Sequence, residues 1–224
     1  MKKNYLVAGL CFFFSHVLYA QAVKLAKNEL ETVNVSMSVE KLGDKEVVKV
    51  IMDTTIKKAD QSTYVRLKGI EFQNGTIELK VLSRLIPNAP DYARGFIGVA
   101  FRINNDNTKF ESMYIRPTNG RADDQVRRNH ATQYFSFPDY GFQRLRDEAA
   151  GKYESYADMA LNEWISLLIV VRGTHAKLFL NNNKQPALIV NDLKLGADNK
   201  GAIGLWVDVG TEGYFSDIKI SKEK

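Results

Sequence analysis

Apolar and polar residues alternate at every second position along most of the chain after about residue 30. Residues 33–39, Val-Asn-Val-Ser-Met-Ser-Val, show this alternation without interruption. Successive side chains of a strand point to opposite faces, so the pattern predicts half-buried β-strands rather than helices. Similar or β-branched runs occupy residues 46–52, 63–72, 76–82, 96–104, 109–116, 164–172, 176–181, 186–190, 201–207 and 213–220.

Turn-forming residues separate these runs. The dipeptide Asn74-Gly75 is typical of tight hairpins and predicts that residues 63–72 and 76–82 pair with each other. Asn105-Asp106-Asn107 and Gly173-Thr174 predict two more hairpins. Helix is plausible only near residues 25–31 and 142–150. We therefore predict an all-β fold, an antiparallel β-sandwich, and because no linker divides the sequence we expect a single domain over residues 23–224.

The first 22 residues have the features of a signal peptide. Lys2 and Lys3 precede an apolar run over residues 6–19, and Ala20-Gln21-Ala22 supplies small residues for cleavage after Ala20 or Ala22. A membrane anchor is the alternative, but the run is shorter than the roughly 20 residues that span a bilayer. We expect export to the periplasm or beyond, and no transmembrane segment.

The charge and the cysteine content exclude several classes of function. The single cysteine, Cys11, lies in the expected signal peptide, so the mature chain has no thiol for catalysis, zinc binding or a disulfide. The net charge of +5 falls to +3 when Lys2 and Lys3 are removed with the signal. Such a small excess does not indicate nucleic-acid binding, which requires a clustered basic face.

One segment interrupts the strand pattern and concentrates the positive charge. Residues 116–161 contain six of the eleven arginines, together with several aromatic residues. A connection of this length inside one domain is usually functional, so we expect a long irregular loop insertion that carries the site.

Several motifs resemble a known superfamily. They are the strand start Asn74-Gly75-Thr76-Ile77-Glu78 and the run over residues 164–220, with its strand at 176–181 and the motif Gly201-Ala202-Ile203-Gly204-Leu205-Trp206. These features resemble the concanavalin A-like lectin/glucanase superfamily of laminin-G-like jelly rolls. Residues 110–117, with the arginine-rich stretch after them, are similar to secreted bacterial candidate glycosyl hydrolases of the 3-keto-disaccharide hydrolase-like domain type. The resemblance implies a carbohydrate-associated jelly roll but no particular reaction.

The carboxylate motif of retaining glucanases in this superfamily is missing. Those enzymes carry E-x-D-x-E or E-x-D-x-x-E on one strand, a spacing that places nucleophile and acid on one face. Here Asp123-Asp124 and Asp147-Glu148 are adjacent pairs, whose side chains would point to opposite faces of a strand. We therefore do not expect that mechanism.

The hairpin at residues 96–116 offers a different candidate. A two-residue turn at Asp106-Asn107 would place Arg102 opposite Glu111, with Ile97, Val99, Phe101 and Ile103 on the other face. The pair would be either a solvated surface ion pair or the floor of a ligand groove with Glu111 as acid or base.

The long loop supplies most of the candidate site residues. Planar guanidinium and amide groups next to aromatic rings suit sugars, and arginine also suits acidic substituents. The same residues could instead hold the loop together through internal Arg–Asp bridges. The candidate ligand-binding residues are Arg102, Arg116, Arg121, Gln125, Arg127, Arg128, Gln133, Tyr134, Tyr140 and Arg144. The candidate catalytic residues are Glu111, Asp123, Asp124 and His130.

We expect no cofactor and no catalytic metal, because His130 has no second histidine near it in the sequence. A structural calcium at Asp106-Asn107 or near Asp192 and Asp198-Asn199 is the alternative. Trp164 and Trp206, on apolar strands, are expected in the core.

Three functions remain open. The first is a secreted glycan-binding protein that recognises a carbohydrate, and not a nucleic acid, in a groove where the arginine- and aromatic-rich loop lies over the concave sheet. The second is a glycoside hydrolase or lyase that lacks the E-x-D-x-E motif and uses the same groove. The third is a structural or protein-interaction module of the cell envelope. The oligomeric state is not predicted.

Overall fold

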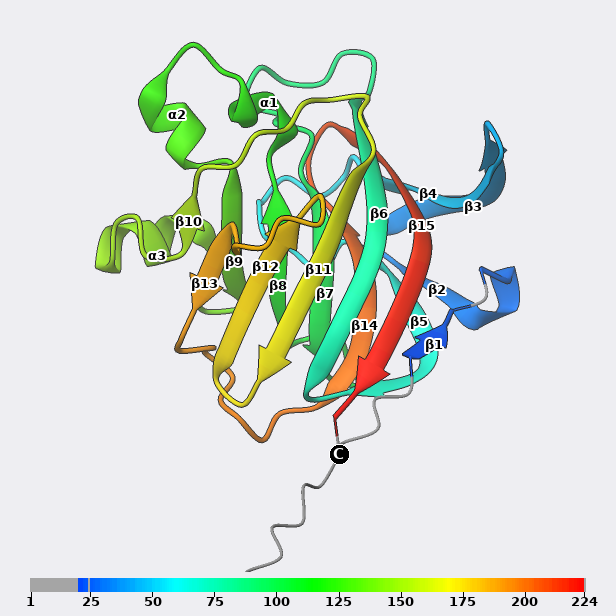
Figure 1. Ribbon diagram of the computed structural model, residues 1–224. Coiled ribbons are helices and arrows are strands. Elements are labelled where there is room, and N and C mark those ends of the chain that lie inside the picture. The colour runs from blue at the N-terminus through cyan, green and yellow to red at the C-terminus, as the bar shows by residue number, and fades with distance from the viewer. Residues whose placement is uncertain (1–19, 24, 224) are drawn as a thin grey trace, which may run out of the picture.

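The chain forms two antiparallel sheets packed face to face (Figure 1). The computed structural model describes residues 20–23 and 25–223. The first sheet has the strand order β13-β12-β11-β6-β15-β4-β3, with β1 paired to β15, and the second has the order β10-β9-β8-β7-β14-β5-β2. This arrangement confirms the predicted antiparallel β-sandwich of the concanavalin A-like jelly-roll type.

The strands of the first sheet are β1 (Ala20–Ala22), β3 (Val35–Leu42), β4 (Lys45–Met52), β6 (Gly75–Leu85), β11 (Ile165–Arg172), β12 (His175–Leu180), β13 (Leu188–Val190) and β15 (Thr211–Lys222). Those of the second are β2 (Leu30–Val33), β5 (Tyr64–Phe72), β7 (Ile97–Ile103), β8 (Phe110–Ile115), β9 (Thr132–Phe137), β10 (Glu154–Ser155) and β14 (Gly201–Val207). The helical segments are the 3-10 turn η1 (Lys27–Glu29) and the helices α1 (Pro117–Gly120), α2 (Gln125–Asn129) and α3 (Phe142–Glu148).

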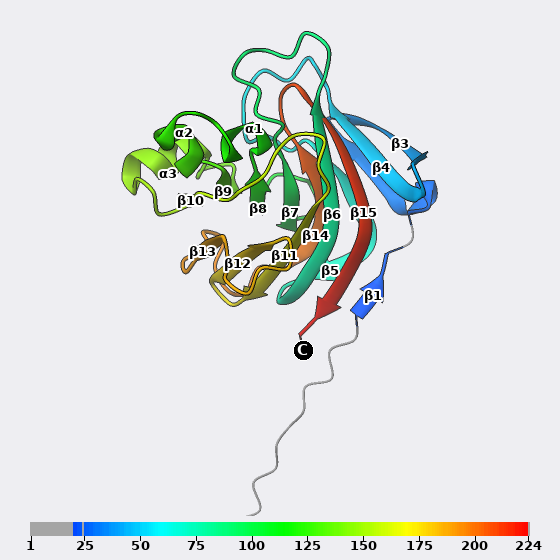
Figure 2. The same ribbon diagram turned by 45° about the horizontal axis from the view of Figure 1, so that its top comes forward.

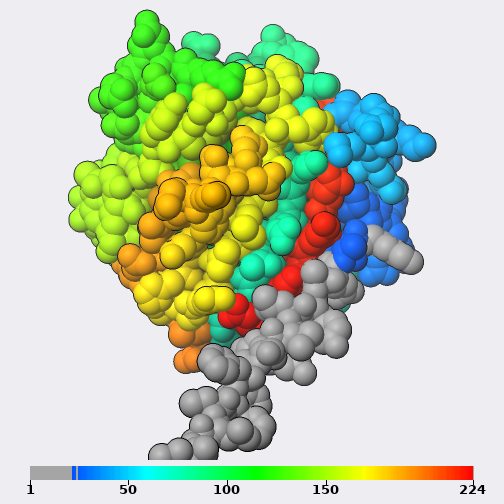
Figure 3. All heavy atoms as spheres, viewed as in Figure 1, coloured from blue at the N-terminus to red at the C-terminus, as the bar shows by residue number. Residues whose placement is uncertain are grey.

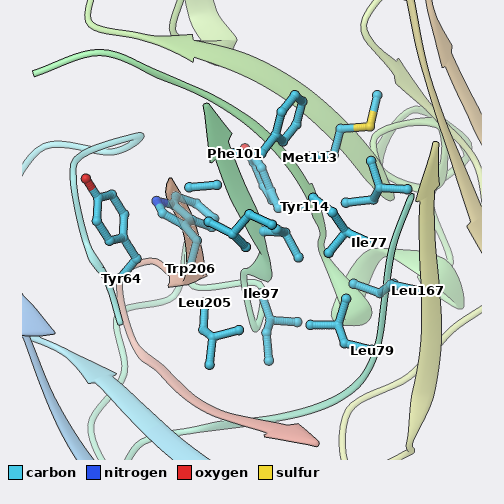
Figure 4. Close-up of a cluster of buried hydrophobic side chains, with 14 of the residues drawn as sticks. Tyr64, Ile77, Leu79, Ile97, Phe101, Met113, Tyr114, Leu167, Leu205 and Trp206 are labelled. Atoms are coloured by element: carbon cyan, nitrogen blue, oxygen red, sulfur yellow. The ribbon is translucent and has the colours of Figure 1, made fainter. Parts of the chain in front are cut away.

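The main hydrophobic core fills the space between the sheets. Ile77 and Leu79 from β6 and Leu167 from β11 face Met113 and Leu205 from the second sheet (Figure 4). All five side chains are buried. Burying one such side chain stabilises the fold by about 1.5–3 kcal/mol.

A layer of aromatic rings covers the other face of the second sheet. Tyr114 packs against Trp206 with 4.8 Å between ring centroids, and Tyr64 meets Phe110 edge to face at 5.4 Å. The indole N–H of Trp206 donates to the carbonyl of Gln61, in the loop that lies over this face. The second sheet is therefore buried on both faces, which is why every residue of β7 and β8 is buried. Trp206 lies in the core as predicted, whereas Trp164 is half-buried beside a small separate cluster.

The predicted hairpin at Asn74-Gly75 is wrong. β5 belongs to the second sheet and β6 to the first, so this dipeptide carries the chain from one sheet to the other. The side-chain oxygen of Asn74 accepts from the backbone N–H of Gly173 at 2.8 Å, which fixes the crossing against the β11–β12 turn.

The hairpin of β7 and β8 exists, but its register differs from the prediction by one residue. Phe101, not Arg102, lies opposite Glu111. Arg102 has a left-handed backbone, with φ of 56°, and the pairing of β7 with β14 shifts at this point. A bulge therefore interrupts the alternation, and Ile103 does not continue the face of Ile97 and Val99: its side chain approaches Gly204 on the aromatic face.

The β11–β12 hairpin is confirmed, since Arg172 pairs with His175 across Gly173-Thr174. The short helix predicted near residues 142–150 is also present, as α3. The segment of residues 116–161 is less irregular than predicted, because β9 pairs with β8 and extends the second sheet. α1, α2 and α3 gather at this end of that sheet (Figure 2).

The expected signal peptide lies mostly outside the described residues, together with Cys11. β1 begins at Ala20 and pairs with the end of β15, so it spans both expected cleavage points. Cleavage and export therefore stay predictions. Among the described residues, no helix has the length and apolar character needed to cross a membrane.

Candidate functional site

A cavity of about 580 Å³ opens where β8 ends and the chain turns into α1. We call it the arginine-lined cavity. Segments far apart in the sequence contribute to its wall, and α2 forms part of a block that stands out at the upper left of the molecular surface (Figure 3). The lining residues that carry charge or an aromatic ring are Lys57, Tyr92, Arg94, Phe96, Tyr114, Arg116, Asp124, Arg127, His130, Phe142, Arg146 and Asp208.

Local sequence signals place the first of these residues. Pro117 stands at the first turn of α1, where its missing N–H does no harm. Asp124 then caps α2, since its side chain accepts from the backbone N–H of Arg127 at 2.8 Å. These two short helices turn the chain so that Arg116, Arg127 and His130 line the same cavity.

Arg116 is held rigidly at the cavity wall. Its side chain donates to the Tyr114 hydroxyl at 2.7 Å, to the Gln133 amide oxygen at 3.1 Å and to the carbonyl of His130 at 3.1 Å. The guanidinium also lies over the rings of Tyr114 and Phe142. With Arg116 almost fully buried, these contacts fix its charge in one position.

Glu154 is a shared acceptor behind the cavity. It forms a two-point ion pair with Arg146, at 3.0 and 2.7 Å, and its carboxylate lies 3.2 Å from Nε2 of His130. Burial, assisted by the charges of Arg146 and Arg116, lowers the pKa of His130 despite Glu154 and Asp124, which act in the opposite direction. This shift favours the neutral form of the imidazole.

Two buried carboxyl groups lie beside Tyr114. Asp208 lines the cavity and accepts from the backbone N–H groups of Asp60, at 3.0 Å, and Val209, at 2.7 Å. Burial raises the pKa of Asp208 to about 6. Burial raises the pKa of Asp60 to about 7, to which the charge of Asp208 also contributes. The cavity is therefore bordered by a carboxyl group that titrates close to neutral pH.

The structure brings four of the predicted site residues together. Arg116, Asp124, Arg127 and His130 line the cavity, and Gln133 lies behind Arg116.

Other predicted site residues lie outside the cavity. Arg121 is exposed and paired with Asp158 and Glu163. This pairing agrees with the alternative in which the arginines hold the loop together. Asp123 and Gln125 are also exposed, and Arg128 stacks on Tyr156. Arg144 lies over the ring of Tyr140, away from this cavity.

Arg102, Glu111 and Tyr134 belong to a separate buried network, which corrects the predicted Arg102–Glu111 groove. Arg102 donates to the carbonyls of Gln73, Gly173 and Gly196. Glu111 accepts from the Tyr134 hydroxyl and, at 2.8 Å, from the backbone N–H of Leu195. Burial raises the pKa of Glu111. The register shift at Arg102 is the reason that no ion pair joins it to Glu111 among the described residues.

Residues of the site that the sequence did not point to include Arg94, Arg146, Glu154, Asp208 and the exposed Tyr92. Arg146 lies in the arginine-rich segment and could have been named. The other four come from loops or a two-residue strand, where no periodic pattern marks them.

The described residues contain no cluster of side chains that would bind a metal ion. Within residues 20–23 and 25–223, no group of three or more His, Cys, Asp or Glu side chains could hold an ion. Asp192, considered above for calcium, accepts instead from Lys152 and Lys194, both at 2.9 Å.

A larger groove, of about 1110 Å³, lies on the outer face of the first sheet. Phe179 supplies its only aromatic ring among the described residues, and Asp217 there is paired with Lys45 and Lys80. The arginine-lined cavity is the stronger candidate because it combines several aromatic rings with convergent charged groups.

The two sheets define the protein as a β-sandwich of the jelly-roll type, with a polar cavity beside them. A family model for the 3-keto-alpha-glucoside-1,2-lyase-like domain matches residues 28–221. The chain therefore belongs to that family. No curated protein matches the sequence.

Solved structures share this fold at low sequence identity. The carbohydrate-binding module CBM66 from Bacillus subtilis is 14% identical, with a TM-score of 0.58 over 86% of this chain and 95% of that one. A candidate glycosyl hydrolase from Parabacteroides distasonis is 15% identical, with a TM-score of 0.51 over 87% and 100%. A galectin-like protein of unknown function from Bacillus subtilis is 8% identical, with a TM-score of 0.52 over 93% and 100%.

Proposed function

We propose that the protein binds a carbohydrate in the arginine-lined cavity. The observation that carries this proposal is the combination, in one cavity, of fixed guanidinium donors with the rings of Tyr92, Phe96 and Phe142. A volume of about 580 Å³ suits a short glycan, since small-molecule sites fall between roughly 300 and 1,000 Å³. The family description and the likeness to a carbohydrate-binding module support the same function.

The chemistry of a sugar matches this lining. Its hydroxyl groups accept from guanidinium N–H groups, while the apolar face of its ring packs against an aromatic side chain. Tyr92 is 61% exposed and lies at the cavity, so its ring can contact a ligand without moving core residues.

A glycan array followed by calorimetry on the bound sugar tests the proposal. We expect Tyr92→Ala to weaken binding by about 0.5–1.5 kcal/mol, the range for a lost aromatic contact. The matched control is Tyr156→Ala, another exposed tyrosine that does not line the cavity. Equal effects of the two substitutions would contradict this site, and the absence of any carbohydrate ligand would favour the envelope interaction module.

Cleavage of a glycoside is the second candidate, and one observation favours it. Asp208, with its pKa raised to about 6 by burial, and the neutral His130 line the same cavity. Breaking a glycosidic bond by hydrolysis or elimination needs one group that accepts a proton and one that donates a proton to the leaving oxygen. A carboxyl group with a raised pKa suits the donation of a proton, and a neutral imidazole suits its acceptance. The 1,2-lyase in the family description is consistent with elimination.

Release of reducing sugar by the protein and its Asp208→Asn and His130→Gln variants tests cleavage. We expect each substitution to lower turnover by about 10²-fold or more while the sugar still binds. Asp217→Asn, on the opposite sheet, is the control. Turnover that survives both substitutions would remove these residues from the mechanism, and a protein that binds without turnover is a binding protein only.

A further inference from the structure

Three guanidinium groups come together in the arginine-lined cavity from separate parts of the chain. Arg94 lies in the segment before β7, Arg116 follows β8, and Arg127 is in α2. We call these residues the arginine trio. Their charges act on one another, since Arg127 and Arg116 both lower the pKa of Arg94, after the larger effect of burial.

Two members of the trio are bound only by neutral acceptors. Arg94 donates to the carbonyls of Asp91 and Ala93, at 2.5 and 2.8 Å. Arg127 donates to the side-chain oxygens of Asn119 and Thr118, at 3.0 and 3.1 Å. In the part of the chain that the structure describes, neither arginine has a carboxylate within 4.0 Å, whereas the exposed Arg121 has two.

The acids around the cavity are engaged elsewhere. Asp124 caps α2, and Asp208 accepts from two backbone N–H groups. Glu154 lies 3.7 Å from Arg116, but it also serves Arg146 and His130. Asp91 raises the pKa of Arg94, but its effect is smaller than the lowering by burial, by Arg127 or by Arg116.

Without a bound anion this arrangement lowers the stability of the folded protein, because like charges held together in a partly buried site repel one another. An anion in the cavity would turn this repulsion into attraction, and it would be recognised through paired N–H donors. A guanidinium presents a planar fork of donors that matches a carboxylate.

We propose that the arginine trio binds the carboxylate of an acidic sugar, so that the ligand is a uronic acid or a glycan that contains one. This inference rests on the proposed carbohydrate binding and specifies its ligand. A sulfate ester offers related oxyanion chemistry and is distinguished by the experiment.

Calorimetry with matched pairs of methyl glycosides tests the inference. The probes are the glucuronide and glucoside, the galacturonide and galactoside, and the mannuronide and mannoside, together with the 6-sulfate of each neutral sugar. We expect at least one uronide to bind about tenfold or more tightly than its neutral counterpart. We also expect this preference to shrink at high salt, because the trio is only partly buried.

Arg94→Gln should remove most of the preference, because it should weaken uronide binding about tenfold more than it weakens binding of the neutral sugar. Arg127→Gln is the second variant and should act in the same way, so a folding defect in one does not decide the test. Arg121→Gln, which removes the same charge outside the cavity, should change neither affinity. Thermal melts identify any variant that fails to fold.

Equal binding of a uronide and its neutral partner would overturn this inference and leave the proposed function intact. Binding of the sulfates without the uronides would overturn the assignment of a carboxylate. If no sugar of any kind binds, including those of the glycan array, the proposed function itself fails.

Discussion

At the scale of single residues, Asp60 is a carboxyl group that the fold keeps from water. Its side chain is 5% exposed, and Oδ2 accepts from the backbone N–H of Phe142 at 2.5 Å. The other oxygen, Oδ1, is buried without a hydrogen-bond partner among the described residues. Burial, together with the neighbouring Asp208, raises the pKa of Asp60 to about 7.

This raised pKa predicts that the protein loses stability as the pH rises. Between the unfolded pKa of about 4 and the folded pKa, the folded state binds more protons than the unfolded state, so the free energy of unfolding falls with pH. Asp60→Asn removes the charge but keeps an acceptor for the N–H of Phe142. We expect the variant to exceed the wild type by about 2–4 kcal/mol at pH 8 and to equal it near pH 4.

Urea unfolding at pH 4, 6 and 8 measures this difference. Asp217→Asn is the matched control, because Lys45 and Lys80 hold the pKa of Asp217 down, in the opposite direction, although its partial burial raises it. An Asp60→Asn protein that is less stable than the wild type at pH 8 would contradict the raised pKa.

Arg102 shows why the sequence predicted some site residues but not their environment. The sequence places Arg102 and Glu111 on neighbouring strands, and the structure agrees. A single left-handed residue then shifts the pairing, and the expected Arg102–Glu111 ion pair is replaced by a buried network in which each side chain has other partners. Alternation cannot reveal such a bulge, because arginine gives no local signal for a positive φ.

At the scale of secondary-structure elements, Asn74-Gly75 shows the limit of turn chemistry. The dipeptide marks a sharp change of direction, and that much was predicted. Which sheet the next strand joins depends on partners far away in the sequence, here β11 and β15 for β6. The existence of a strand, in contrast, depends on local alternation, so the strands with strong alternation were predicted well. β9 and β10 were not, since loops with mixed charge surround them.

The crossing at Gly75 has room for no side chain. Its φ is 133°, and a Cβ atom there would lie 1.9 Å from the carbonyl oxygen of Ser221. We expect Gly75→Ala to destabilise the protein by about 3 kcal/mol, from backbone strain and this collision. Gly69→Ala is the control: it has φ of 68° but nothing within 4 Å, so it should cost about 1–2 kcal/mol.

Urea denaturation of the two variants compares them directly. Equal losses of stability would show that the close approach to β15 contributes nothing beyond the backbone conformation of glycine.

At the scale of the whole molecule, the arginine-lined cavity joins parts of the chain that the sequence separates. Its wall includes Lys57, Phe96, Arg127, Phe142 and Val209. Four of these lie in loops or short helices outside the two sheets, and Phe96 directly precedes β7. The sandwich could be predicted from periodicity, but a site assembled from so many loops could not, because no local pattern encodes how loops meet.

A carbohydrate in this cavity should therefore stabilise several segments at once. At a free concentration 100 times its dissociation constant, a ligand raises the free energy of unfolding by about 2.7 kcal/mol. We expect slower amide hydrogen exchange in α2, in α3 and around residues 208–209, measured by mass spectrometry.

The groove on the first sheet provides the internal control. Protection confined to residues lining that groove, such as Leu168 and Phe179, would place the ligand there and contradict the cavity.

The network around Arg102 has a consequence for the order of folding. Its guanidinium joins carbonyl groups that lie 29, 71 and 94 residues away in the chain. Contacts of such long sequence separation form only after both sheets have come together, since closing long loops costs entropy. We therefore expect the contacts of Arg102 to form after the transition state for folding. Arg102 should then slow the rate of unfolding far more than it speeds the rate of folding, and so lengthen the lifetime of the native protein.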